Sequence, residues 1–235
     1  MRTQFGKQIR DSDICVLCGH EPATTKEHIP PQAVFSINPP EYLLVPACSI
    51  CNNSTKLDDE YFRQILSMSS RTEEGLRVWK EKVLPKFEGR PATKAGLREQ
   101  LGPVEAFHKD IGRLVLPGVW ADAKRVDRVL KKMVWGLYWW HEGKFLAASV
   151  PLEIFFMNVT QVPEYFNDPH SLEIYRKTIP GIYQDATVIR TFYYTYAIND
   201  QLTAWYFFFY RQNVFIVLTD FSRISGSDQG TGWTS

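Results

Sequence analysis

The strongest periodic pattern of apolar and polar residues runs from residue 122 to residue 141. Apolar side chains recur there at the spacing of one face of an α-helix. They are Val126, Val129, Leu130, Met133, Val134, Leu137 and Tyr138. Asp122 is a suitable N-cap, and Gly143 is a suitable residue just after the last turn. The pattern therefore predicts a long amphipathic helix between these two residues.

The last third of the chain changes to a pattern typical of β-strands. Runs rich in β-branched and aromatic residues cover 152–159, 187–198, 202–210 and 214–221. Asn199-Asp200 and Gln212-Asn213 are turn-forming pairs between the last three runs, so a meander or a pair of hairpins is expected. The aromatic run 205–210 is expected to pack in the core of this sheet, because a half-buried strand hides alternate side chains.

Shorter elements are predicted in the first half. Residues 24–29 and 42–46 have the composition of short strands, and a helix is expected from Ser54 onward. A second helix over 73–84 is expected to end at Pro85, since proline interrupts helical hydrogen bonding. A further strand-like run, 114–116, is followed by Pro117-Gly118, which is expected to stop it.

These elements predict an α+β fold. We expect a small ββα module over residues 1–62, followed by an α+β domain of unassigned function over 63–235. Within that domain, 63–145 is expected to be helical and 146–224 mainly β, with the long amphipathic helix packed on an antiparallel sheet. Residues 225–235 have the composition of a flexible tail.

Composition favours a folded protein with a substantial core. Hydrophobic residues make up 44% of the chain and aromatic residues 14%. The N-terminal residues contain no apolar run, so a secretory signal is not expected. The most apolar region, 202–219, is interrupted by Arg211, so neither a membrane span nor a membrane partner is expected. A cytoplasmic location, where thiols stay reduced, follows as an expectation.

Positive charge is concentrated in the middle of the chain. The formal net charge is only +1, yet residues 61–132 carry 16 Lys/Arg against 9 Asp/Glu. A basic segment suits a polyanion such as nucleic acid, although solvated helix faces give the same pattern. The candidate contacts to a nucleic-acid backbone are Lys56, Arg125, Arg128 and Lys132, the last three on the polar side of the predicted long helix.

The most specific chemical signal is a pair of Cys-x-x-Cys motifs. Cys15 and Cys18 form the first, and Cys48 and Cys51 form the second, about thirty residues later. In a reduced compartment this spacing is typical of a tetrahedral zinc site with four thiolate ligands. Gly19 can relieve the tight turn after the first pair. Four thiolates leave no open position for a substrate, so this zinc is expected to be structural.

Together with the residues between the cysteine pairs, these motifs resemble the HNH endonucleases of the ββα-metal type. Glu27-His28-Ile29-x-Pro31 matches a D/E-H-I-x-P pattern, and the last cysteine motif continues as Asn52-x-x-x-Lys56. The resemblance covers about residues 10–62. It implies that His28 is a general base that activates water, while Glu27 and Asn52 hold a catalytic divalent cation.

The implied chemistry is hydrolysis of phosphodiester bonds in DNA. A carboxylate and an amide oxygen suit Mg²⁺ or Mn²⁺, and an imidazole can take a proton near neutral pH. Two alternatives stay open: a ribonuclease, and a non-catalytic zinc-ribbon-like module that binds nucleic acid or protein. A homodimer and a protein partner are also open.

The chain departs from the family pattern at one position. The middle asparagine, which helps to orient the histidine, normally precedes the second strand directly, whereas Asn38 is the nearest asparagine here and lies further back. Asn38 or a backbone carbonyl would have to take that role. Asp58, Asp59 and Glu60 could add a metal ligand, but acidic residues are equally typical of a helix start.

Overall fold

The computed structural model describes residues 13–39, 42–87, 100–108, 112–158 and 190–221. The tail predicted for 225–235 and the start of the strand predicted at 187 lie outside these residues. In the described part of the chain, no helix combines the length and apolarity that crossing a membrane requires.

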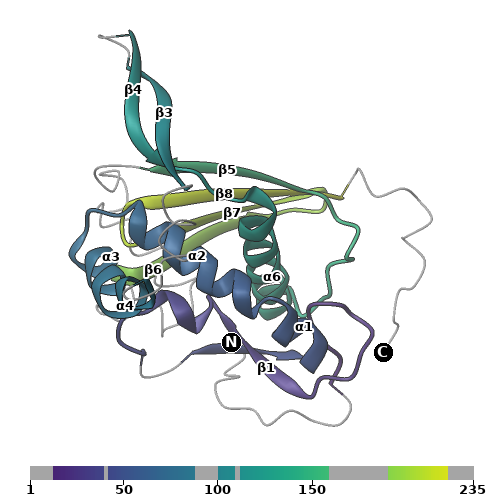
Figure 1. Cartoon of the computed structure of the whole chain (residues 1–235). Coiled ribbons are helices and arrows are strands. Elements are labelled where there is room, and N and C mark those ends of the chain that lie inside the picture. Colours follow the sequence, from purple (N-terminus) through teal and green to yellow (C-terminus); the bar gives the residue numbers. More distant parts are fainter. Residues whose placement is uncertain (1–12, 40–41, 88–99, 109–111, 159–189, 222–235) are drawn as a thin grey trace.

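A four-stranded antiparallel sheet forms one layer of the molecule (Figure 1). Its strands are β5 (Leu152–Asn158), β6 (Phe192–Ile198), β7 (Leu202–Phe209) and β8 (Asn213–Asp220), in the order β5-β8-β7-β6. The predicted strands are therefore confirmed within the described residues. Trp205, Phe207 and Phe209 are fully buried, as expected for the aromatic run.

The turn between β7 and β8 lies slightly earlier than expected. Tyr210 and Arg211 have positive φ angles of 52° and 55°, and Asn213 already begins β8. Tyr210 is held in this left-handed conformation by the packing and hydrogen bonding of its side chain, since it is fully buried and its hydroxyl donates to the carbonyl of Val34 at 2.7 Å. Tertiary contacts therefore override the local preference for asparagine at the turn.

Two helices lie between this sheet and an N-terminal hairpin (Figure 1). They are α2 (Lys56–Met68) and α6 (Ala123–Glu142). The α6 bounds match the amphipathic pattern: Asp122 accepts a hydrogen bond from the amide of Arg125, and Gly143 has the left-handed φ of 67° that ends the helix. On α2, Phe62 packs edge-on against Phe209 of β7 at 5.2 Å between ring centroids.

The hairpin consists of β1 (Thr25–Ile29) and β2 (Leu43–Ala47), which pair antiparallel with Glu27 opposite Val45. The short helix η1 (Gln32–Val34) lies between them in sequence, and α1 (Ser49–Ser54) follows directly. Helix α6 approaches the hairpin so closely that a Cβ at Gly136 would lie 2.8 Å from Ile29. Buried residues on both sides of residue 62 form one hydrophobic cluster, and α2 itself spans that position.

The remaining helices cover one side of the molecule. They are α3 (Glu73–Val78), the π-helical turn η2 (Trp79–Val83) and α4 (Leu84–Phe87). The expected stop at Pro85 is wrong, because the helical segment continues to Phe87. The π-helical turn η2 ends two residues before Pro85 and changes the backbone hydrogen-bonding pattern there. The N–H that proline lacks therefore does not interrupt a regular α-helical ladder.

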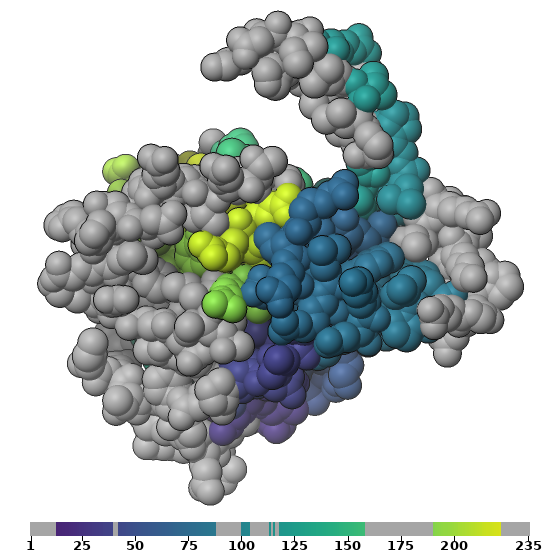
Figure 2. Space-filling view, turned by 90° about the vertical axis from the view of Figure 1, so that its left-hand side faces the viewer, coloured from purple at the N-terminus to yellow at the C-terminus, as the bar shows by residue number. Residues whose placement is uncertain are grey.

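The remaining two strands form a hairpin that projects from the body of the molecule as an arm (Figures 1 and 2). They are β3 (Leu101–His108) and β4 (Gly112–Val119). Pro117 lies within β4 and pairs with Pro103 of β3 instead of stopping the strand. Each strand of a two-stranded hairpin is an edge, where a missing N–H is tolerated.

Candidate functional site

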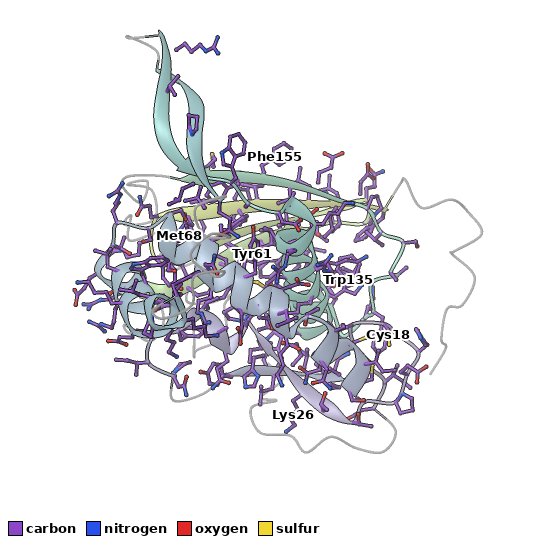
Figure 3. All side chains as sticks on the ribbon, viewed as in Figure 1. Cys18, Lys26, Tyr61, Met68, Trp135 and Phe155 are labelled. Atoms are coloured by element: carbon purple, nitrogen blue, oxygen red, sulfur yellow. The ribbon has the colours of Figure 1, made fainter. Side chains whose placement is uncertain are left out.

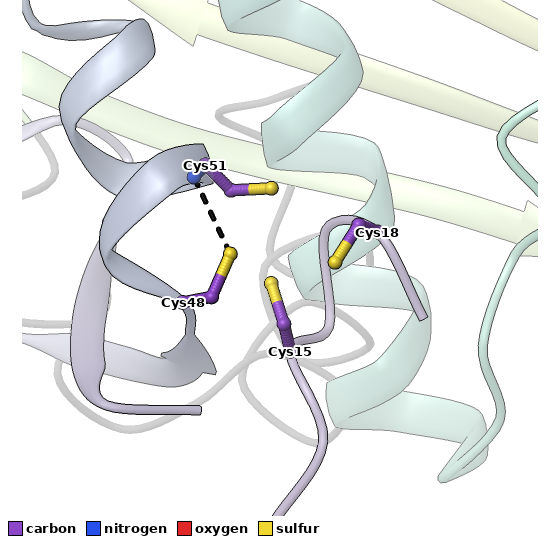
Figure 4. Close-up of side chains that lie close together, drawn as sticks. All are labelled: Cys15, Cys18, Cys48 and Cys51. Carbon is purple, nitrogen blue, oxygen red and sulfur yellow. Dashed lines mark hydrogen bonds between the residues drawn. The ribbon is translucent and has the colours of Figure 1, made fainter. Parts of the chain in front are cut away.

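Sulfur atoms of Cys15, Cys18, Cys48 and Cys51 converge at one point (Figure 4). All four lie within 4.8 Å of one another. Tetrahedral zinc–thiolate bonds of about 2.3 Å place sulfurs just under about 4 Å apart, so the cluster could hold a zinc ion with little movement. The chemistry of the donor set therefore fits the expected metal, and its closed geometry fits a structural role.

Local backbone geometry explains why these side chains meet. Gly19 has a φ of 76°, and its amide donates to the carbonyl of Cys15 at 2.8 Å, which closes the first turn. Cys48 is the N-cap of α1, and its sulfur accepts a hydrogen bond from the amide of Cys51 at 3.4 Å. The second pair is thus fixed where β2 ends and α1 begins.

Burial disfavours the thiolate form of two of the four cysteines, whereas backbone hydrogen bonds help to lower the pKa of Cys18 to about 7. Burial, together with neighbouring sulfur groups, raises the pKa of the Cys51 thiol, and burial likewise raises the pKa of Cys15. A divalent cation stabilises thiolates directly and so reverses this effect.

A polar cleft of about 550 Å³ is lined by residues of β1, η1, α1, α2 and η2. We call it the His28 cleft. It brings together the three residues that the family resemblance singles out, Glu27, His28 and Asn52. Asn38 lines the same cleft, and so do four cationic side chains, Lys26, Lys56, Arg63 and Lys82. Figure 3 shows Lys26 extending from β1 on the side of the molecule farthest from the four-stranded sheet.

His28 is half-buried near the end of β1. Its ring packs edge-on against Tyr42, with 4.7 Å between ring centroids. Burial, and then the positive charge of Lys132, lower the pKa of His28 below its usual value. The imidazole is therefore neutral near pH 7 and able to accept a proton. Within the described residues no hydrogen bond joins Asn38 to His28, and the ring of His28 instead contacts Tyr42.

Glu27 points into the interior, where it meets a buried ammonium group. Its Oε1 accepts hydrogen bonds from Nζ of Lys132 at 3.1 Å and from the amide of His28 at 3.2 Å. Lys132 also contacts Asp59, with 2.6 Å between Nζ and a carboxylate oxygen. Burial raises the pKa of the Glu27 carboxyl, and the charge of Lys132 opposes that shift. This buried network joins β1, α2 and α6.

The exposure expected for Lys132 is wrong. Its relative exposure is only 4%, so it offers no charge to a nucleic-acid backbone from the surface. The reason is the pair of carboxylates, Glu27 and Asp59, that β1 and α2 place against α6, since a buried charge is stable only when paired.

The other cationic candidates have different settings. Arg125 and Arg128 both contact the buried carboxylate of Asp58, at 2.7 Å and 2.6 Å, and so fasten α6 to α2. Their hydrogen bonds lower the pKa of Asp58, with Arg128 the larger influence. Arg128 remains exposed, as does Lys56 on the rim of the His28 cleft.

Asn52 fastens α1 to β1. Its side-chain nitrogen donates to Oγ1 of Thr25 at 3.0 Å and to the carbonyl oxygen of Lys26 at 3.1 Å. Because both donors are used, the amide oxygen is left as an acceptor. Asn52 therefore fixes the strand that carries Glu27 and His28.

Glu27 and Asn52 partly fit the expected divalent cation. Oε2 of Glu27 is buried without a hydrogen-bond partner, as expected for an oxygen that a cation would contact. Asp59 lines the same cleft and offers a third oxygen ligand, whereas the nearby ammonium of Lys132 opposes a second positive charge. Beyond the cysteines, the described residues contain no group of three His, Cys, Asp or Glu side chains placed to share an ion.

The sequence motifs do not include three of the cationic residues that line the cleft, Lys26 of β1, Arg63 and Lys82. Arg63 and Lys82 belong to α2 and η2. One signal could have identified Arg63: it lies seven residues after Lys56, on the same face of the predicted helix.

Comparisons of this chain with protein-family models, with curated proteins and with solved structures found no match.

Proposed function

We propose that this protein is a zinc-stabilised endonuclease that hydrolyses phosphodiester bonds in DNA. The observation that carries the proposal is the position of His28, a histidine with a lowered pKa in a polar cleft that is also lined by four cationic side chains. The resemblance of residues 10–62 to HNH endonucleases agrees with this chemistry.

His28 is the general base. A neutral ring nitrogen takes a proton from water, the water oxygen forms a new bond to phosphorus, and one ester P–O bond breaks. The leaving oxygen takes a proton from solvent. Tyr42 holds the ring by its edge contact, and Asn52 holds the backbone of β1 at Lys26, two residues before the ring.

The catalytic cation of this proposal is Mg²⁺ or Mn²⁺, with Glu27 and Asn52 as its ligands. When bound, it supplies positive charge that stabilises the phosphate oxygens as the bond breaks. The ammonium of Lys132 offsets part of the cost of burying the Glu27 carboxylate, although burial still raises the pKa of that carboxyl.

The choice of a polyanionic substrate is supported by the charge of the His28 cleft. Its acids are already paired, Glu60 with Lys86 at 2.7 Å and both Glu27 and Asp59 with Lys132. Lys56, Arg63 and Lys82 also line the cleft and form no ion pair among the described residues, so their charges can attract phosphate groups.

Plasmid nicking tests the proposal. Supercoiled plasmid is incubated with the purified protein and Mg²⁺ or Mn²⁺, beside His28→Ala and the control His20→Ala. His20 is a matched control because its side chain is 71% exposed and lies outside the cleft. We expect nicking by the wild type and by His20→Ala but not by His28→Ala.

Two other outcomes would favour a different function for the protein. Cleavage of RNA but not DNA under the same conditions would make the protein a ribonuclease. Binding of either polymer without cleavage, with every metal tried, would favour the non-catalytic binding module.

A further inference from the structure

Arg63 is a buried cation without a bonding partner in the described part of the chain. Only 8% of the residue is exposed, and Nε is buried with no hydrogen-bond partner. No ion pair joins its guanidinium to any described carboxylate. Arg63 lines the His28 cleft and also a second cavity of about 260 Å³ beside Val83 and Phe87.

A guanidinium group in this position is unfavourable unless something binds it. Arginine does not lose its proton in proteins, so it cannot escape the cost of burial by becoming neutral. Glu60, whose pKa the charge of Arg63 helps to lower, is engaged with Lys86 at 2.7 Å. The described fold therefore holds an arginine whose donors are available at the cleft.

A second cation lies close to Arg63. Lys82 comes from η2, a π-helical turn, and π turns are often found at functional sites. Arg63 and Lys82 line the same cleft, and burial, followed by the charge of Arg63, lowers the pKa of Lys82 while Glu81 opposes that shift. Two cations that line one cleft, neither of them in an ion pair among the described residues, favour an anion between them.

Phosphate is the anion that suits this pair. A guanidinium presents parallel N–H donors that match two phosphate oxygens, while an ammonium acts as a compact point charge. Lys56, on the same face of α2 as Arg63, extends the positive lining along the cleft.

We propose that Arg63 and Lys82 form a phosphate-binding subsite in the His28 cleft. This inference rests on the proposed function: the subsite receives a phosphate group of the nucleic-acid backbone next to the one that is cleaved. It fixes the substrate and does not take part in proton transfer.

Binding of inorganic phosphate tests this site without any need for turnover. The protein used is the full chain carrying His28→Ala, which separates binding from cleavage. Thermal unfolding and calorimetric titration are followed with phosphate, and with sodium chloride at matched ionic strength as the screening control. We expect phosphate, but not chloride, to raise the unfolding temperature.

Three further substitutions then locate the site. Arg63→Gln is expected to weaken phosphate binding at least tenfold and Lys82→Gln several-fold. Arg77→Gln is the matched control, since Arg77 of α3 is half-buried, forms an ion pair with Glu73 and lies outside the cleft. It is expected to leave phosphate binding unchanged.

Stability without phosphate separates a binding arginine from a structural one. Because Arg63 has no bonding partner among the described residues, Arg63→Gln is expected to unfold at the same temperature as its parent or higher. A large loss of stability, or failure of Arg63→Gln to fold, would overturn the proposal. Unchanged phosphate binding by both Arg63→Gln and Lys82→Gln would overturn it as well.

The phosphate subsite and the nuclease activity can be refuted separately. If the wild type cuts no nucleic acid but Arg63→Gln still abolishes phosphate binding, the subsite stands and the nuclease does not. If His28-dependent nicking is found while Arg63→Gln binds phosphate like its parent, the nuclease stands and the subsite does not.

Discussion

Lys132→Met removes the ammonium group that links β1, α2 and α6. Methionine keeps most of the length of the lysine stem, so the packing of α6 is largely preserved and the charge is what changes. Two carboxylates remain behind, Glu27 at 4% relative exposure and Asp59 at 15% for its side chain. Both then lack the cation that they contact in the wild type.

The expected cost follows from the burial of the network. Removing one partner from a buried ion pair typically destabilises a protein by about 3–5 kcal/mol, because the remaining charge stays buried without compensation. Protonation of the carboxylates relieves part of this, and burial already raises the pKa of Asp59 to about 6 despite Lys132. A loss of about 3 kcal/mol near pH 7 is therefore the expected value.

Urea denaturation followed by tryptophan fluorescence measures this loss. Lys124→Met is the matched control, since Lys124 is exposed on the same helix and its substitution is expected to change stability by less than about 0.5 kcal/mol. If Lys132→Met lies within about 1 kcal/mol of the wild type, the buried network does not hold these elements together and the reasoning is wrong.

Three other substitutions test separate parts of the structure. Burial lowers the pKa of His141 to about 4. The stability that the buried neutral imidazole contributes is therefore complete above about pH 6.5 and is lost as the pH falls toward 4. The decrease in unfolding free energy from pH 7 to pH 5 should be about 2 kcal/mol larger in the wild type than in His141→Gln. Gly136→Val is expected to cost about 1–3 kcal/mol in urea denaturation, because its side chain would overlap Ile29. Cys48→Ser is expected to lose the roughly one zinc per chain that metal analysis should find in the wild type, and to unfold more readily, whereas full retention of zinc would contradict the four-thiolate centre.

Local patterns predicted much of the fold. The apolar stripe of α6, its Asp122 cap and its Gly143 end depend on neighbouring residues, and the structure has all three. The four cysteines were identified by spacing alone, since two residues between ligands suffice to bring each pair to one ion. The turn at Tyr210 was placed slightly late because a contact with Val34, far away in sequence, determines it.

The candidate site was only partly predictable. Its motif residues, Glu27, His28 and Asn52, line one cleft as expected. The buried state of Lys132 could not be predicted from α6, because the carboxylate that pairs with it at 3.1 Å lies 105 residues earlier in the chain. Arg63 was missed for the same reason: only the fold shows that its donors have no bonding partner in the described residues.

The initial rate of plasmid nicking by the wild type, compared with His28→Ala, tests the central claim most directly. A general base typically contributes about 10²–10⁴-fold to the rate, so His28→Ala should be slower by that factor while His20→Ala matches the wild type. Far-ultraviolet circular dichroism of both variants confirms that each is folded. Nicking by folded His28→Ala at the wild-type rate would contradict the assignment of His28 as the catalytic base.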